Sequence, residues 1–384
     1  MYYFPVRKLR NLTKTSANNI PQIEQIIYLS TVFPKLMDSI FSDILMKKGG
    51  FFLVRRLIPL ILIVFVVNAM FSNVGSAKET PSQEEIMNKR MAIYIQFQDH
   101  IVPWYHLAAI DQYERNIQAV RPDIPKRDSI IAIQFSKEYW AGAFNPLADD
   151  TSPLTIKYFG GLGLDGNGDG VANPEDDEDI MFTMSNYLSQ YGPTVEDFKI
   201  ALWEYYQSEQ VVNQILTIAK LYKHFDTINI DTHVFPVPVR GYNYSYRGTW
   251  GANRGWGGRR IHEGTDIFAG YSTPVLSTSY GVVEIMGWNE FGGWRIGIRD
   301  NHNTYHYYAH LSYFNKDLKI GDIVEPGTML GGVGSSGYGK EGTSGKFPPH
   351  LHYGMYKFNG RTEWAFDPYP SLVQWEKYSR QQKK

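Results

Sequence analysis

Arg260-Ile-His262-Glu-Gly-Thr-Asp266 is the stretch around which this chain of 384 residues is organised. Two stretches further along add to its chemistry, Tyr308-Ala-His310-Leu311 and Pro349-His350-Leu-His352. Together the three stretches contain four histidines and an aspartate. The chain has no cysteine, so a metal site must be built from histidine and carboxylate ligands, both of which zinc accepts. The three stretches therefore predict a metal site.

Strand periodicity decides which of these side chains can meet. Successive side chains of a strand point to opposite faces, so His350 and His352 are expected on one face. The same spacing predicts a shared face for His306, Tyr308 and His310. The backbone can in this way bring four histidines to one cleft.

Strand signals surround the three stretches. Gly264 argues against a helix across residues 260–266, so the two ligands of that stretch come from a strand end or a turn. From Phe235 onward the sequence is rich in glycine, tyrosine and tryptophan and has short alternating runs. The runs cover residues 281–286, 294–299 and 304–310, with a hairpin turn at 300–303. We expect an all-β domain over residues 235–370 and a peripheral polar tail over residues 371–384.

The segment from about Phe235 to Asp367 resembles the lysostaphin/LytM-type zinc endopeptidases of bacterial cell walls, the duplicated hybrid motif peptidases. The motifs that carry the resemblance are His262-x-Gly-x-Asp266, Tyr308-x-His310-Leu, Gly321-Asp-Ile-Val-x-x-Gly327, Gly331-x-x-Gly334 and His350-x-His352. The resemblance implies that His262, Asp266 and His352 hold zinc. It also implies that His310 and His350 are the catalytic histidines, and that the substrate is peptidoglycan.

These groups are suited to hydrolysis. Three protein ligands leave a fourth zinc position open to water, whose pKa then falls toward neutrality. One histidine can accept the proton of the water and pass it to the leaving amine, while the other stabilises the oxyanion. The sequence does not assign these two roles between His310 and His350.

The loop over residues 335–347 is longer than the usual turn before such a His-x-His strand. Its side chains Tyr338, Lys340, Glu341 and Lys346 are candidates for a wall of the substrate groove. A surface hairpin without function is the alternative, because long loops are either functional or mobile.

Composition limits the function classes. A chain of this length accommodates at least two domains. Its 38 basic and 39 acidic residues produce no overall field that would favour nucleic acid. We expect an α+β multidomain protein whose function depends on local sites.

The N-terminal part predicts a targeting segment. A nearly continuous apolar run over residues 57–71 follows basic residues at positions 47, 48, 55 and 56, the pattern of a secretory signal or signal anchor. The run is short for a membrane span, and Gly75-Ser-Ala77 offers a cleavage site. Residues 46–77 are thus a cleaved signal or a membrane anchor, with a buried helix as the third alternative. The chain after Lys78 is expected outside the cytoplasm.

Residues 1–45 do not fit a signal, whose basic region normally starts near the initiator. Our hypothesis is that the native protein begins at Met46, and that residues 1–45 are an extension of uncertain status.

Residues 80–226 have helical periodicity. Thr80 and Gln83 have capping-box spacing, with Pro81 at the first helical position, which predicts a helix to about Gln98. A second helix is expected from Pro103. Further helices are expected over residues 180–191 and, as one long helix after the 192–194 turn, up to residue 222. Residues 227–234 are the predicted linker.

A calcium-type loop lies inside the helical region. Asp165, Asn167 and Asp169 occupy positions 1, 3 and 5, the carbonyl of Val171 occupies position 7, and Asp176 stands at position 12 where a glutamate is usual. The pattern predicts a Ca²⁺ site. A solvated Asp/Gly turn without metal is the alternative.

The helical region resembles the lysozyme-like domain of membrane-bound lytic transglycosylases. The resemblance rests on residues 102–114, 165–187 and 201–222. It implies a glycan-site acid at Glu114. Two departures weaken this role: Tyr205-Tyr-Gln-Ser replaces the substrate stretch of the family, and Arg115 is expected to pair with Glu114 and lower its pKa, opposite to what a general acid needs. A glycan-positioning domain is the alternative.

The pairing of these two regions resembles the sporulation-associated wall peptidases of bacilli, of the LytH type. By analogy the bond cleaved is that between L-alanine and D-glutamate. We therefore expect an extracytoplasmic zinc endopeptidase of peptidoglycan, bound to the membrane if the N-terminal segment is retained. The alternatives are a noncatalytic envelope scaffold or hydrolase activator, and a bifunctional enzyme that also uses Glu114. Protein partners are not predicted.

Overall fold

The computed structural model describes residues 82–127, 129–255 and 258–382. The predicted extension (1–45) and signal or anchor (46–77) lie outside the described residues. Within the described ranges, no helix combines the length and the apolar character needed to cross a lipid bilayer.

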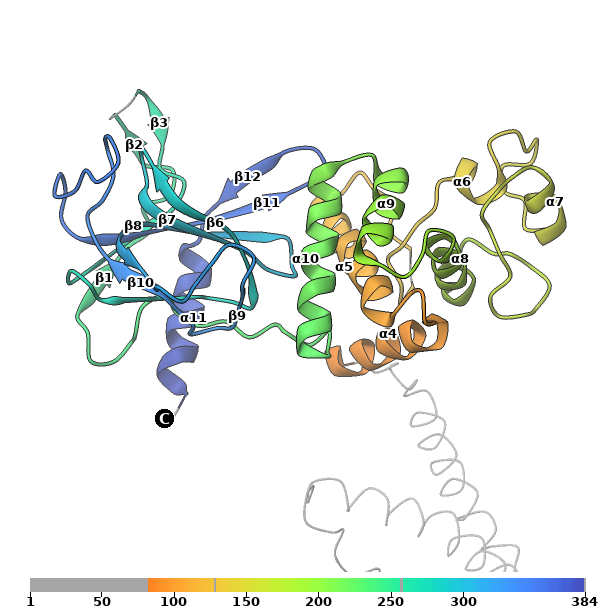
Figure 1. Ribbon diagram of the computed structural model, residues 1–384, viewed down its shortest axis with the longest axis horizontal. Coiled ribbons are helices and arrows are strands. Elements are labelled where there is room, and N and C mark those ends of the chain that lie inside the picture. Colours follow the sequence, from red (N-terminus) through yellow and green to blue (C-terminus); the bar gives the residue numbers. More distant parts are fainter. Residues whose placement is uncertain (1–81, 128, 256–257, 383–384) are drawn as a thin grey trace, which may run out of the picture. The chain divides into compact units, whose positions relative to one another are not determined.

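Residues 83–225 are a mainly helical region, as the periodicity predicts (Figure 1). The helices are α4 (Gln83–Phe97), α5 (Trp104–Val120), α6 (Lys137–Ala141), α7 (Pro153–Tyr158), α8 (Asp177–Ser189), α9 (Val195–Tyr206) and α10 (Glu209–Phe225). The apolar positions of α5 are buried, so this helix is central to the apolar cluster of the region. Whether the region has a lysozyme-like fold stays a prediction.

Two helix boundaries differ from the expected ones. The N-cap of α4 is Ser82, whose hydroxyl accepts a hydrogen bond from the amide of Glu85 at 3.1 Å. The expected long helix up to residue 222 is instead two helices. Gln207 ends α9 in the left-handed conformation with φ of 50°, and the hydroxyl of Ser208 then caps α10. A serine directly after a left-handed residue is a strong restart signal, and it outweighs the continuous helical periodicity.

A buried polar network fixes α4 against α5. Asp111 is fully buried, and its carboxylate accepts hydrogen bonds from the hydroxyl of Tyr94 at 2.5 Å and from Nε of Arg90 at 3.1 Å. It also accepts from the amide of Ala132. A buried carboxylate is tolerated only when its oxygens are paired in this way.

The C-terminal region is a predominantly antiparallel sheet (Figure 1). Its main path runs in the order β1-β4-β11-β8-β7-β6-β9. The strands are β1 (Tyr244–Tyr246), β4 (Thr265–Ala269), β5 (Pro274–Leu276), β6 (Gly281–Asn289), β7 (Gly293–Arg299), β8 (Thr304–Phe314), β9 (Ile323–Val324), β10 (Met329–Val333), β11 (His350–Phe358) and β12 (Glu363–Phe366), with β2 (Asn253–Arg254) and β3 (Arg260–Ile261) as a separate hairpin. The three predicted runs correspond to β6, β7 and β8.

The expectation of a peripheral polar tail is wrong. Residues Tyr369–Gln381 form helix α11, which lies beside the sheet (Figure 1). Leu372 and Trp375 belong to the apolar cluster of the sheet. The carboxylate of Glu376 accepts hydrogen bonds from the hydroxyls of Tyr244 and Tyr246. Leu372 and Trp375 are three residues apart and therefore lie on one face of the helix, so this segment with a polar average composition still buries an apolar face.

The segment predicted as a linker, residues 227–234, connects α10 with the β region. Ile228 and Ile230 of this segment are buried in the apolar cluster of the helices. The cluster also contains Val282 and Phe358 of the sheet region, and the side-chain amide of Asn116 donates to the carbonyl of Asn301 at 2.9 Å. The connection is therefore packed along part of its length.

Candidate metal centre

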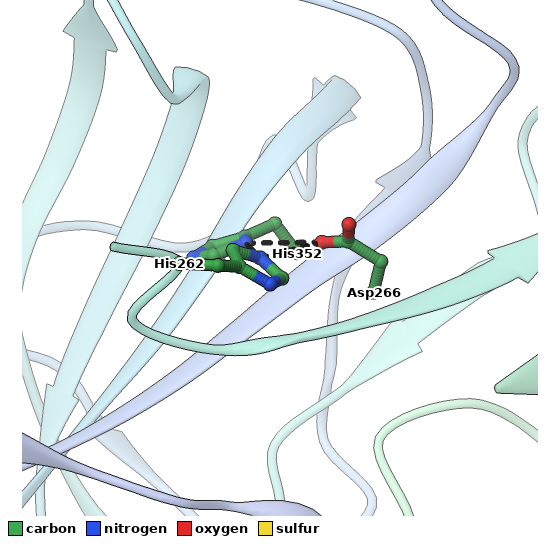
Figure 2. A group of neighbouring side chains, drawn as sticks. All are labelled: His262, Asp266 and His352. Carbon is green, nitrogen blue, oxygen red and sulfur yellow. Dashed lines mark hydrogen bonds and ion pairs between the residues drawn. The ribbon is translucent and has the colours of Figure 1, made fainter. Parts of the chain in front are cut away.

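Adjacent strands bring His262, Asp266 and His352 together. His262 directly follows β3, Asp266 lies at the start of β4, and His352 lies on β11 directly opposite Asp266 in the strand pairing. Nε2 of His262 is 3.0 Å from Oδ1 of Asp266, and Nδ1 of His352 is 3.1 Å from the same oxygen. Figure 2 shows the three side chains converging. In the described part of the chain this is the group of three whose ligand atoms could share one metal ion.

The glycine of the His-x-Gly-x-Asp spacing has a steric cause. A Cβ atom at Gly264 would lie 2.6 Å from Cε1 of His352 and 2.8 Å from its Nε2. Distances below 3.0 Å are not tolerated, so only glycine lets the turn pass over this imidazole. The prediction that both ligands come from strand ends or a turn, and not from a helix, is confirmed.

Neighbouring groups orient the ligands. Nδ1 of His262 lies 2.9 Å from the carbonyl oxygen of Thr249, where it can donate its proton and leave Nε2 for a metal. Nη2 of Arg254 donates to Oδ2 of Asp266 at 2.6 Å, while Oδ1 faces the histidines. Neither Thr249 nor Arg254 was predicted as a site residue, because each lies outside the motif whose ligand it orients.

His310 and His350 flank the ligand group. Their ring centroids are 4.9 Å apart, and that of His310 is 5.9 Å from His352. Nδ1 of His310 is 2.7 Å from the carbonyl of Ser336, and Nδ1 of His350 is 2.8 Å from that of Pro348. A proton on Nδ1 satisfies each carbonyl and leaves Nε2 as an acceptor. The five predicted side chains are thus brought together.

The expected shared face of His306, Tyr308 and His310 is wrong. His306 and Tyr308 are fully buried, and His306 contacts Asp300 at 3.0 Å away from the cleft. Register shifts interrupt the pairing of β8 with β7 and with β10, and His310 has φ of 64°. This left-handed residue changes the alternation and turns the imidazole into the cleft. Strict period-two reasoning cannot detect such an irregularity.

Burial and charge give the site residues the protonation states of metal ligands and bases. Burial lowers the pKa of His310 well below its ordinary value, and the neighbouring His352 and His350 lower it further. Burial also lowers the pKa of His350 and of His352, although Asp266 opposes both shifts. Burial alone would raise the pKa of Asp266, but the close imidazoles of His262 and His352 hold it well below its usual range. At neutral pH these shifts favour neutral imidazoles beside an ionised carboxylate.

The donor set fits zinc. Two nitrogen atoms and one oxygen atom lie 2.9 to 3.1 Å from one another. Ligand atoms of a tetrahedral zinc site are ~3.4 Å apart, given bond lengths of about 2.0–2.1 Å. The ligand atoms need to move apart by only a few tenths of an ångström, about 0.3 to 0.5 Å, to reach the zinc geometry. His262, Asp266 and His352 would therefore hold the ion.

The centre lies in a pocket of about 420 Å³. Tyr338 lines this pocket, as expected, and so does Phe347, whereas Lys340, Glu341 and Lys346 are not among its lining residues. The lining also includes Arg254, Arg260, Glu263, Phe291, Tyr307 and Tyr356, which were not predicted as site residues. The only sequence signal for these residues is that they lie close in sequence to the histidine motifs.

Comparison with known proteins identifies the family. Residues 260–368 match peptidase family M23. The L-Ala--D-Glu endopeptidase of Bacillus subtilis (strain 168) is 53% identical over 325 residues, which are 84% of this chain and 99% of that protein. The chain belongs to peptidase family M23. It is therefore an enzyme, and the sequence-based recognition of a LytM-type peptidase is confirmed.

Shorter similarities are confined to one part of the chain. Lysostaphin of Staphylococcus staphylolyticus is 36% identical over 114 residues, which are 29% of this chain and 22% of that protein. A solved structure of the lysostaphin catalytic domain of Staphylococcus simulans is 33% identical and covers 35% of this chain and 95% of that chain, with a TM-score of 0.28. The similarity to the Bacillus protein, by contrast, extends over most of this M23 peptidase.

Glu114 of the helical region has a different environment from the expected one. Arg115 does not pair with it, because its Nη2 contacts Asp111 at 3.3 Å and the carbonyl of Ile130 at 2.7 Å. The hydroxyl of Tyr206 donates to Oε1 of Glu114 at 2.6 Å. Burial raises the pKa of Glu114 to about 7, and the hydrogen bond from Tyr206 limits the rise. The prediction that Arg115 lowers this pKa is wrong.

The calcium-type loop is held by its own backbone. The carboxylate of Asp165 accepts from the amides of Gly168 and Gly170, and Asn167 and Asp169 each accept from an amide two residues on. Asp176 is the N-cap of α8. Asp179, three residues beyond the motif, accepts from the amides of Gly166, Asn167 and Asn173. These bonds give no support to Ca²⁺, whose binding by Asp165, Asn167, Asp169, Val171 and Asp176 stays a prediction.

Proposed function

We propose that this M23 peptidase is a zinc-dependent endopeptidase that hydrolyses the bond between L-alanine and D-glutamate in peptidoglycan stem peptides. The observation that carries the proposal is the complete site: three ligands in contact and two histidines with their Nε2 atoms available. The choice of bond is supported by the name and the 53% identity of the Bacillus subtilis relative.

The residues present are suited to proton transfer. A zinc ion would supply a Lewis acid and would lower the pKa of water toward neutrality. His310 and His350 are each held by a backbone carbonyl through Nδ1, so neither ring needs to reorient during turnover. Either Nε2 can accept a proton and return it to the amine that leaves. The lowered pKa of each ring keeps both imidazoles in the neutral form at neutral pH, so each Nε2 has a lone pair available for a proton.

The proposal includes a location outside the cytoplasm. Its support is the basic and then apolar pattern of residues 46–77 and the fact that peptidoglycan is an exterior polymer. A role in sporulation rests on the family resemblance alone.

Digestion of purified peptidoglycan by the full chain tests the proposal. We expect new D-glutamate amino termini, detected by mass spectrometry, and their loss when a chelator removes the metal. Addition of zinc after the chelator should restore them. Intact peptidoglycan in the presence of zinc would contradict the proposal and would favour the noncatalytic scaffold, which the complete ligand set otherwise disfavours.

The environment of Glu114 favours a second candidate function, glycan cleavage. A general acid near neutral pH needs a raised pKa, and Glu114 has one of about 7. Glu114→Gln should then abolish anhydro-sugar products of peptidoglycan and leave the peptide products unchanged. Glu196→Gln, at an exposed position of α9, is the matched control. If the wild type releases no anhydro-sugar, the glycan-positioning role is favoured instead.

The same variant gives a stability prediction. The pKa of Glu114 is higher in the folded than in the unfolded chain, so the folded state binds more protons between about pH 4.5 and pH 7. Wild-type stability should therefore fall as pH rises through this window. Relative to wild type, Glu114→Gln should be more stable at pH 8 by up to ~3 kcal/mol, and should show no such gain at pH 4. Chemical denaturation at both values checks the sign, and an equal difference at both would contradict it.

A further inference from the structure

Two arginines face each other on the hairpin beside the metal centre. Arg254 of β2 and Arg260 of β3 are direct cross-strand partners, and both line the pocket. Directly opposed residues of an antiparallel pair project to the same side, and like charges there destabilise the hairpin. Such a local cost points to a functional requirement for two cations.

The two arginines have different partners. Arg254 donates to the carboxylate of Asp266 at 2.6 Å. For Arg260, the described residues provide no carboxylate within ion-pair distance, and its buried Nε has no hydrogen-bond acceptor among them. The guanidinium carbon of Arg260 lies 5.0 Å from the ring centroid of Phe291. Contact with an aromatic ring uses the π-face of the ring and leaves guanidinium N–H groups available for an anion.

The proposed substrate provides such an anion. This step rests on the proposed function. A glutamate whose amino group is in the scissile bond uses one carboxyl group to continue the peptide, and its other carboxyl group stays free. The free carboxylate is carried by the residue on the amine side of the scissile bond. A cation that lines the pocket of the metal ligands is therefore placed to meet it.

We infer that Arg260 binds the free carboxylate of the acidic residue on the amine side of the scissile bond. Arginine offers two parallel N–H donors that match the two oxygens of a carboxylate. Arg254 is less suited, because Asp266 already occupies its guanidinium. Glu263, which also lines the pocket, would repel an acid bound near it, so the two side chains together orient the substrate. Arg260 thereby selects peptides with an acidic residue directly after the cut.

A pair of synthetic stem peptides tests this assignment with the full chain and zinc. One carries D-glutamate with its carboxylate free, and the other carries the corresponding neutral amide. Wild type should cleave the acid with a kcat/KM about 10 to 100 times that of the amide, the range for one charge-assisted hydrogen-bonded contact. In Arg260→Gln the ratio should fall to about one through slower cleavage of the acid, chiefly by a higher KM. Arg260→Lys, which keeps the charge but not the fork, should give an intermediate ratio.

Arg259→Gln is the matched control, since it makes the same charge change at the neighbouring exposed position, which does not line the pocket. It should keep the wild-type ratio. Undiminished cleavage of the amide by Arg260→Gln shows that the variant is folded and loaded with metal. If Arg260→Gln keeps the wild-type preference, or if wild type cleaves both peptides equally, the assignment of Arg260 is overturned and the proposed function stands. If wild type cleaves neither peptide, the proposed function fails and the assignment with it.

Discussion

Replacing His352 with alanine is expected to lower peptide cleavage by roughly a thousandfold or more and to remove bound zinc. The imidazole contacts both other ligands, so its loss leaves His262 and Asp266 as two of the three ligands. Two protein ligands bind zinc far more weakly than three, and without the ion the site has no Lewis acid. The measurements are zinc content per chain and kcat/KM on peptidoglycan fragments.

The control for this prediction is His224→Ala, which removes an exposed imidazole near the end of α10. It should change neither zinc content nor activity. His352 lies within β11, where alanine is less favourable than a larger side chain but does not break the strand pairing. Circular dichroism should accordingly be unchanged. A His352→Ala protein that lost hydrolysis yet kept its full biological role would revive the scaffold hypothesis.

The shared face of His350 and His352 and the irregular backbone between His262 and Asp266 could be predicted because local rules determine them, whereas the ligand roles were implied by the family resemblance. His352 and His350 are two residues apart on a regular strand, so alternation alone gives their shared face. The glycine between His262 and Asp266 indicates a turn without any knowledge of the fold. These inferences needed only contacts close in sequence, and the structure confirms them.

Features that depend on distant contacts could not be predicted. The environment of Glu114 depends on Tyr206, which is 92 positions away, and on the engagement of Arg115 by Asp111 and Ile130. Sequence adjacency suggested a pair between Arg115 and Glu114, but tertiary partners prevail. The burial of α11 is similar, because the apolar cluster that receives Leu372 is built from strands far away in sequence.

Backbone irregularity is a further reason why part of the site could not be predicted from the sequence. Strand alternation predicted that His306 and Tyr308 share the cleft face of His310, but only His310 lines the cleft, and it has a left-handed backbone conformation next to a register shift. Non-glycine residues rarely adopt this conformation, and when they do they are often at functional sites. The strain is consistent with a side chain that must leave the core face of β8 to reach the cleft.

Two substitutions of His310 are therefore expected to distinguish the contribution of its imidazole to kcat from the effect of its backbone conformation on protein stability. His310→Ala should reduce kcat about 10²- to 10⁴-fold, the usual contribution of a general acid or base, with zinc content and KM little changed. His310→Gly should be equally inactive but more stable than His310→Ala by about 1 kcal/mol, because glycine adopts φ of 64° without strain.

Steady-state kinetics and thermal unfolding of the two His310 variants measure these effects, and His350→Ala is the informative comparison. His350 has the same anchoring through Nδ1 but regular strand geometry, so its loss should impair catalysis without a glycine-specific gain in stability. A series of substrates whose leaving amines differ in pKa shows which histidine returns the proton. The variant whose kcat falls more for the more basic leaving amines lacks that histidine. If His310→Ala kept wild-type kcat, His310 would have no part in proton transfer, and its strained backbone would need another explanation.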